Sequence, residues 1–275
     1  MNSDKEALVV IPYLAKEAQG CELELAVAGW HKHFKEPHRV VVVGDWDEHV
    51  EKLLVCPEGK SEGSITFIDC PQIEPVRGEY LPHLDQMNKF RAVAAAFPEQ
   101  EYFVYTNDDI YAVKDFTLQD VRLPKINSML IPYIDEKETR WWGDMGRSRK
   151  LCVNNGWPIM DWACHLPVYY GFKLLFYLLT LYCAGKSYEW QNIYFNRLRA
   201  AINAVSEVAP PNDDSDIEYR EPEIVPERGG KWKYAINTAN PGIKTTEEAG
   251  AVWITNANCG WSEKLEELLK KHYGL

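Results

Sequence analysis

Two adjacent carboxylates, Asp108 and Asp109, are the side chains whose spacing most directly indicates chemistry. They follow Asn107, which comes straight after the strand-like run 102–106. Neighbouring carboxylates repel each other unless a cation or several hydrogen-bond donors neutralise them. The carboxyl end of a strand in an α/β sheet is also where ligands bind. The pattern therefore predicts a Mg²⁺ or Mn²⁺ ion held by oxygen ligands against a diphosphate. A helix cap or a turn is the open alternative.

Further charged residues stand near the same expected edge of the sheet. Asp45 and Asp47 directly follow the valines at 40–43, and they could bind the base or ribose of a nucleotide or simply form a turn. Lys89 and Arg91 lie in the helical pattern that precedes run 102–106. A cation there could reach a phosphate, or it could be solvated on the helix surface.

The segment 140–150 is unusual for an acidic chain because it combines two glycines, two tryptophans and several cations. Glycine makes a segment mobile, cations suit phosphate and tryptophan can stack on a sugar face. We predict a lid that closes over a bound donor, with an ordinary exposed loop as the alternative. The candidate contacts in it are Trp141, Trp142, Arg147 and Arg149.

The elements that must position these residues alternate between strand and helix. Apolar residues mark one face of each predicted helix, and a run of valines is typical of a strand covered on both faces. The order predicts an α/β fold: a Rossmann-like, largely parallel sheet flanked by helices, with a more helical C-terminal half. No GxGxxG or GxxxxGK[ST] sequence is present, which favours a metal as the phosphate-binding device. The expected strands are 7–12, 39–43, 64–68 and 102–106, and the expected helices are 20–35 and 83–97.

The length of 275 residues and 46% hydrophobic content suffice for a buried core. We predict one domain over 1–275, with a nucleotide-binding half (1–135) and an acceptor-side and lid half (136–275). The apolar run 172–184 is shorter than the roughly 20 residues that cross a bilayer, so it predicts a core helix and no transmembrane segment. The remaining expected elements are a strand at 127–133, a helix at 187–203, a proline- and acid-rich connection at 206–229, a strand at 252–254 and a helix at 262–273.

The net charge and the spacing of the cysteines limit the classes of function that this chain can have. A formal net charge of −11 argues against a nucleic-acid or anionic-membrane partner, since a phosphate backbone needs a broad basic surface. Seven cysteines form no CxxC pair, which favours reduced thiols over a disulfide framework or a zinc site. The first residues show no basic region followed by an apolar stretch, so a cytoplasmic protein is expected.

The run NKFRAVAAAFPEQEYFVYTNDDIYAVKDF, residues 88–116, resembles the central strand and metal motif of GT-A nucleotide-sugar glycosyltransferases. The runs 8–13 and 40–45 are similar to the first two strands of that family. The resemblance implies a GT-A-like fold, a nucleoside-diphosphate sugar donor and an acidic motif that holds Mn²⁺ or Mg²⁺. Asn107 occupies the first position of the usual D-x-D register and adds no charge, so Asp109 becomes the better metal candidate.

A narrower likeness concerns the sequence YTNDDIY and the later run Cys164-His165-Leu166-Pro167, which resemble the Stealth sugar-phosphate transferases. The two likenesses imply that His165 is a metal ligand or a catalytic acid or base; a half-buried structural histidine is the alternative. Pro167 suits the first turn of the apolar helix, which would place His165 before its positive end and favour the neutral imidazole. Asp161 could orient the ring or act as a base.

The sequence therefore predicts a metal-dependent glycosyltransferase that moves a sugar from a nucleoside-diphosphate sugar to a glycan or other hydroxyl acceptor. Transfer of a sugar 1-phosphate is the alternative within enzymes. A non-catalytic binding protein on the same fold is the alternative from another class.

Overall fold

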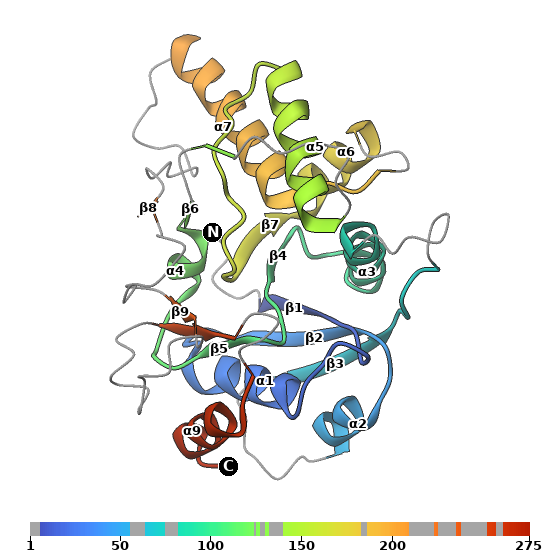
Figure 1. Cartoon of the computed structure of the whole chain (residues 1–275), viewed down its shortest axis with the longest axis vertical. Coiled ribbons are helices and arrows are strands. Elements are labelled where there is room, and N and C mark those ends of the chain that lie inside the picture. The colour runs from blue at the N-terminus through green and yellow to red at the C-terminus, as the bar shows by residue number, and fades with distance from the viewer. Residues whose placement is uncertain are drawn as a thin grey trace.

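The computed structural model describes a central sheet with helices on both faces (Figure 1). The strand order is β3-β2-β1-β4-β7. Strands β1 to β4 run parallel, and β7 runs antiparallel to β4. The strands are β1 (Ala7–Tyr13), β2 (His38–Gly44), β3 (Ser64–Asp69), β4 (Tyr102–Tyr105) and β7 (Val168–Gly171). The described residues are 6–55, 64–74, 82–123, 125–126, 130–131, 140–182, 186–208, 223–224, 235–237, 252–256 and 261–275.

Successive side chains of the buried strands point to opposite faces of the sheet, and apolar side chains on both faces explain why both are covered. In β2, Val40 and Val42 pack into one hydrophobic cluster, whereas Val41 and Val43 pack into a second one. The first cluster includes residues of α1 (Glu22–His33), and the second includes residues of α3 (Pro82–Ala96) and α6 (Phe172–Tyr182). A parallel strand covered on both faces needs such a continuous apolar run. The predicted α/β fold is confirmed.

A second sheet joins distant parts of the chain. Its order is β5-β10-β9, and β10 runs antiparallel to β5 and parallel to β9. This pairing places the C-terminal strand directly beside the residues that follow the acidic pair. A two-stranded sheet pairs β6 with β8. The strands are β5 (Ile110–Ala112), β6 (Lys125–Ile126), β8 (Glu223–Ile224), β9 (Ala235–Asn237) and β10 (Trp253–Thr255).

Most predicted elements of the first half are confirmed, but several short ones were missed: the helices α2 (Glu48–Val55) and α4 (Leu118–Arg122) and the strands β5 and β6. The strands at 7–12, 39–43, 64–68 and 102–106 correspond to β1 to β4, and the two helices correspond to α1 and α3. The other described helices are α5 (Arg140–Asn154), α7 (Trp190–Val208) and α9 (Glu263–Tyr273).

The second half departs more from expectation. Helix α6 buries Leu175 and Leu178 and exposes Tyr177 and Leu181, so the apolar run is a core helix on one face only. No described helix is long and apolar enough to cross a membrane. The predicted strand 127–133 and the connection 206–229 fall mostly outside the described residues. The free cysteines of the described part are Cys21, Cys70, Cys152 and Cys164.

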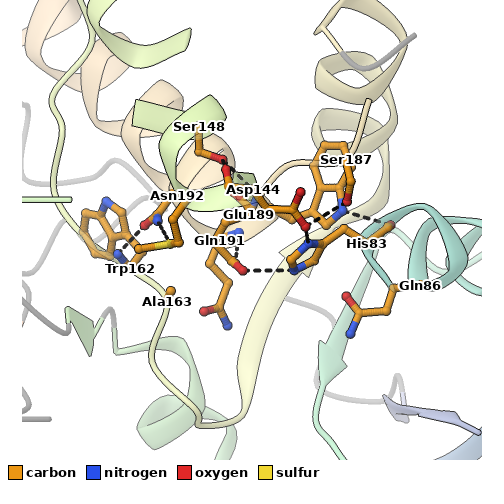
Figure 2. Close-up of polar contacts among 12 residues, drawn as sticks. His83, Gln86, Asp144, Ser148, Trp162, Ala163, Ser187, Glu189, Gln191 and Asn192 are labelled. Atoms are coloured by element: carbon orange, nitrogen blue, oxygen red, sulfur yellow. Dashed lines mark hydrogen bonds and ion pairs between the residues drawn. The ribbon is translucent and has the colours of Figure 1, made fainter. Parts of the chain in front are cut away.

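A buried charge cluster ties the helices of the second half to α3 (Figure 2). The two ring nitrogens of His83 contact different carboxylates, with Nδ1 at 2.5 Å from Asp144 and Nε2 at 3.0 Å from Glu189. Ser187 also donates to Asp144, at 2.9 Å. The indole of Trp190 donates to the His83 carbonyl at 3.1 Å. Through the imidazole and the backbone carbonyl of His83, these contacts join α3 to α5 and to the start of α7.

Candidate active site at the carboxyl end of the sheet

The acidic pair lies on a turn that connects the two sheets. The Ile110 N–H donates to the Asn107 carbonyl at 3.4 Å, so the chain reverses between the end of β4 and the start of β5. β4 lies between β1 and β7, so the turn stands at the carboxyl edge of the central sheet, where α/β folds bind ligands. The predicted placement of Asp108 and Asp109 at a strand end is confirmed.

Asp108 carries the clearest electrostatic signature of this turn. Burial raises the pKa of its carboxyl, and the charges of Asp109 and Glu22 raise it further, to about 8. A carboxyl in this environment holds its proton near neutral pH unless a cation offsets the neighbouring charges. The turn is therefore a place where positive charge is bound favourably.

His165 lies against the acidic turn. Its Nε2 is 2.9 Å from Oδ2 and 3.0 Å from Oδ1 of Asp109, whose side chain is only 16% exposed. Loss of surrounding water opposes protonation of the ring, but the Asp109 charge and hydrogen bond and the Asp108 charge outweigh it, so the pKa of His165 is raised. The imidazole side chain is itself 43% exposed. His165 thus lies beside the acidic pair, and its role as a metal ligand or a catalytic acid or base stays a prediction.

The expected lowering of the His165 pKa is wrong, and the cause is topological. Pro167 does not stand in the first turn of α6, because strand β7 intervenes between them. β7 pairs antiparallel with β4, so the residues just before β7 lie beside those just after β4. His165 therefore faces the carboxylate of Asp109 and does not directly precede α6, and its pKa rises where a decrease was predicted.

Asp161 is buried, at 2% exposure, and its Oδ1 accepts the Ala163 N–H at 3.1 Å. The hydrogen bond that orients the His165 ring goes to Asp109. In this arrangement Asp161 shapes the segment that leads to His165.

Asp45 and Asp47 both shape the neighbouring strand ends. Asp45 accepts the backbone N–H of Ala15 at 3.2 Å and that of Gln72 at 3.3 Å, which ties the chain after β1 to the chain after β3. Asp47 accepts backbone N–H groups at the start of α2 and the Tyr13 hydroxyl at 2.6 Å. These contacts match the alternative in which both residues simply form a turn. Their carboxylates also add negative charge to the same edge of the sheet.

Lys89 and Arg91 have different surroundings on α3. The Lys89 ammonium is 2.7 Å from Asp85 Oδ2 and 3.0 Å from the Tyr13 carbonyl oxygen, and the residue is 2% exposed. These contacts commit Lys89 to the protein interior beneath the end of β1. Arg91 is exposed on the same helix.

The segment predicted to be a mobile lid is part of helix α5, which packs against α7. Arg147 pairs with Asp144 and donates to the Ser187 carbonyl at 2.7 Å, whereas Arg149 donates to the Ile131 carbonyl at 3.1 Å. Both cations bind backbone carbonyls of neighbouring segments, and residues 140–150 belong to a packed helix where a mobile lid or an exposed loop was predicted.

The spacing of the buried residues explains why α5 is helical. Met145, Ser148 and Cys152 are fully buried and follow a helical period. The two glycines, Gly143 and Gly146, are also buried, so they allow close packing of the helix where mobility was expected. The rings of Trp141 and Trp142 pack edge to face at 4.6 Å, and Trp142 remains 46% exposed.

Two residues near the turn were missed by the sequence interpretation. Glu22, the first residue of α1, is 4% exposed and acts electrostatically on Asp108. Asn256 follows β10 and donates its backbone N–H to the Asp109 carbonyl at 3.3 Å. Glu22 is separated from Asp108 by three strands in sequence and Asn256 by about half the chain, so no local motif signals either of them.

The side chains of the turn suit a hard divalent cation that takes some of its ligands from a bound substrate. Among the described residues, no group of three or more His, Cys, Asp or Glu side chains is placed to hold a metal ion. Mg²⁺ and its relatives in phosphate-transfer sites commonly use one or two carboxylates and take further ligands from substrate phosphates and water. Asp108 and Asp109 provide the carboxylates, and the imidazole of His165 is a nitrogen ligand that Mn²⁺ accepts. Asp108 and Asp109 are therefore of the residue type that such an ion uses, with its remaining ligands supplied by substrate and water.

Comparisons with known proteins give a limited result. No family model matches this chain, and no curated protein matches it. The structure is similar to the apo form of the glycosyltransferase GlyE of Streptococcus pneumoniae TIGR4, at 10% identity and a TM-score of 0.38 over 98% of this chain. It spans 61% of that GlyE chain.

A second similar structure is the galactosyltransferase LgtC in complex with donor and acceptor sugar analogs, at 12% identity and a TM-score of 0.43. That match covers 97% of this chain and 95% of LgtC. Both similar structures are glycosyltransferases, the class that residues 88–116 resemble. At these identities and TM-scores the likeness does not establish an activity.

Proposed function

We propose that this chain is a glycosyltransferase that uses a nucleoside-diphosphate sugar together with a divalent cation at Asp109. The observation that carries the proposal is the acidic turn at the carboxyl edge of the central sheet. Two carboxylates are adjacent there, the pKa of Asp108 is raised to about 8, and His165 faces Asp109. Carboxyl groups with strongly perturbed pKa values cluster at functional sites, which supports a functional role for this turn.

The residues of the turn have distinct roles in this proposal. Asp108 and Asp109 hold the cation, and His165 lies where it can join them or hold a proton beside the leaving group. When bound, Mn²⁺ or Mg²⁺ would neutralise charge that builds on the leaving diphosphate. The acceptor oxygen attacks the anomeric carbon, the bond from that carbon to the diphosphate oxygen breaks, and the acceptor proton passes to a base.

Sugar 1-phosphate transfer is the second candidate, and the contact between His165 and Asp109 supports it as well. That contact joins the two sequence segments that resemble the Stealth enzymes. In this reaction the acceptor oxygen attacks the phosphorus next to the sugar, and a nucleoside monophosphate leaves. Product analysis separates the two reactions, because only glycosyl transfer releases a nucleoside diphosphate.

Metal-dependent nucleotide binding tests the proposal. Nucleoside diphosphates and their sugars are screened by thermal shift with and without Mn²⁺, and a ligand at about 100 times its dissociation constant should stabilise the protein by about 2.7 kcal/mol. Binding that needs both nucleotide and Mn²⁺ supports the proposal. If no nucleotide stabilises the protein in either condition, a non-catalytic protein on this fold becomes the better interpretation.

The variant Asp109→Asn should lose Mn²⁺-dependent nucleotide binding and keep its fold, because it removes a charge without changing side-chain shape. The matched control is Asp115→Asn, since Asp115 lies six residues further on and its side chain is 64% exposed. Isothermal titration with Mn²⁺ compares the two variants. Wild-type Mn²⁺ affinity in Asp109→Asn would contradict the assignment.

A further inference from the structure

Asn256 lies where three elements meet beside the acidic turn. Its Nδ2 donates to Glu22 Oε1 at 2.6 Å, and its Oδ1 accepts the Tyr111 hydroxyl at 2.8 Å. Its backbone N–H donates to the Asp109 carbonyl at 3.3 Å. The residue is 2% exposed. Both polar atoms of the amide side chain and the backbone nitrogen are therefore used by residues around the turn.

These contacts fix the turn from both sides. Asp109 and Tyr111 flank Ile110, and Ile110 itself pairs with Thr255 in the second sheet. Asn256 thus holds the residue before Ile110 through its carbonyl and the residue after it through its hydroxyl. The backbone of the turn carries the Asp109 carboxylate. The position of that carboxylate therefore depends on the contacts that Asn256 makes with the turn.

The same amide holds the Glu22 carboxylate. Glu22 Oε2 accepts the Gln19 N–H at 2.8 Å, so its two oxygens are each hydrogen-bonded and the carboxylate is fixed at the start of α1. Only an amide can donate to Glu22 and accept from Tyr111 at one position with this shape. Aspartate would lack the donor, and leucine would lack both groups.

We propose that Asn256 is a positioning residue for the cation site: its side chain holds Glu22 and the Tyr111 hydroxyl beside the turn, and through these two contacts it sets the affinity of the turn for a divalent cation. This inference rests on the proposed function. It makes the strand β10, at the far end of the sequence, a part of the site. Residues that orient metal ligands typically change metal affinity by about 10- to 100-fold when they are removed.

A purely structural role is the alternative, and the chain offers a matched control for it. Tyr273 of α9 donates its hydroxyl to the Ala112 carbonyl at 2.7 Å, at the other end of β5. The variant Tyr273→Phe therefore removes one hydrogen bond to the same sheet without touching the turn. If Asn256 merely supported that sheet, Asn256→Ala and Tyr273→Phe would have similar effects on the site.

The experiment measures Mn²⁺ binding and hydrogen exchange on the folded full chain. Asn256→Ala should bind Mn²⁺ about 10- to 100-fold more weakly than wild type, whereas Tyr273→Phe should stay close to wild type. Amides of 106–111 should exchange faster in Asn256→Ala than in Tyr273→Phe. If Asn256→Ala does not fold, Tyr111→Phe, which removes only the hydroxyl bonded to Asn256, should show the same two effects in weaker form.

The outcomes separate this inference from the proposed function. Failure of wild type to bind Mn²⁺ refutes the cation site, and the exchange comparison then decides whether Asn256 positions the turn. Equal exchange over 106–111 in Asn256→Ala and Tyr273→Phe overturns the inference in every case. Equal loss of Mn²⁺ affinity in these two variants overturns it as well, since that result assigns Asn256 to general support of the sheet.

Discussion

The charge on His83 should make the stability of this protein fall steeply with alkaline pH. Burial of the ring by itself lowers its pKa, but the charge of Glu189 and the hydrogen bonds to Asp144 and Glu189 raise the pKa to about 10. Figure 2 shows the two carboxylates on either side of the ring. The folded protein therefore binds this proton more tightly than the unfolded chain, in which the pKa is near 6.5.

The sign and size of the effect follow from linkage. The stabilisation is fully present below about pH 6.5 and is lost as pH rises towards 10. The interval from 6.5 to about 10 corresponds to about 5 kcal/mol at 1.36 kcal/mol per pH unit. Between pH 6.5 and 8.5, before tyrosines and lysines titrate, the contribution of His83 should fall by about 3 kcal/mol.

Imidazole nitrogen chemical shifts followed against pH test this directly, with the His83 signal assigned by its loss in His83→Gln. Glu189→Gln should lower the pKa of His83 and cost about 3–5 kcal/mol in urea unfolding, because a buried ion pair loses one partner. The matched control is Glu24→Gln, which breaks the less buried pair of His49 and Glu24, with 20% of each side chain exposed. Loss of that pair should lower the free energy of unfolding by about 1 kcal/mol or less.

Two results would refute the reasoning about His83. The first is an imidazole that titrates near pH 6.5 in the folded protein. The second is a Glu189→Gln variant that loses no more stability than Glu24→Gln, since the buried cluster would then contribute no more than the partly exposed pair.

Two further predictions concern the carboxyl edge of the sheet. Because the pKa of Asp108 is raised from 3.8 to about 8, metal-free wild type should lose stability between those pH values, and Asp108→Asn should remove that loss; urea unfolding at pH 5 and pH 8 compares them. Gly44 has φ +156, and a Cβ there would lie 1.9 Å from the Tyr13 carbonyl oxygen. Gly44→Ala should therefore destabilise by about 3 kcal/mol or more, measured as a lower melting temperature.

The first half of the fold was predictable because its signals are local. The valines of β2 and the one-sided apolar faces of α1 and α3 each lie within one element, and alternation of such elements defines an α/β fold. Asp108 and Asp109 were also identifiable, because their position directly after a buried strand is visible in the sequence. Both features depend on neighbours in the chain.

The features that the sequence did not reveal depend on pairing between distant segments. Four residues, Val168–Gly171, carry no pattern that predicts an antiparallel edge strand, yet this strand reverses the expected pKa of His165. Glu22 and Asn256 likewise reach the turn through helix packing and through β10. The segment 140–150 was misinterpreted because glycine permits both mobility and close helix packing, and only the tertiary contacts of α5 distinguish the two.

The carboxyl edge of the sheet gathers acidic side chains from separate elements. Asp45 and Asp47 follow β2, Asp108 and Asp109 follow β4, and Glu22 begins α1. A free nucleoside diphosphate is itself anionic, so this edge repels it unless positive charge is already present. Lys89 does not offset the repulsion, because its ammonium is committed to Asp85 and the Tyr13 carbonyl. Under the proposed function, the cation must therefore bind before the donor or enter together with it, and an acidic protein can then hold an acidic substrate.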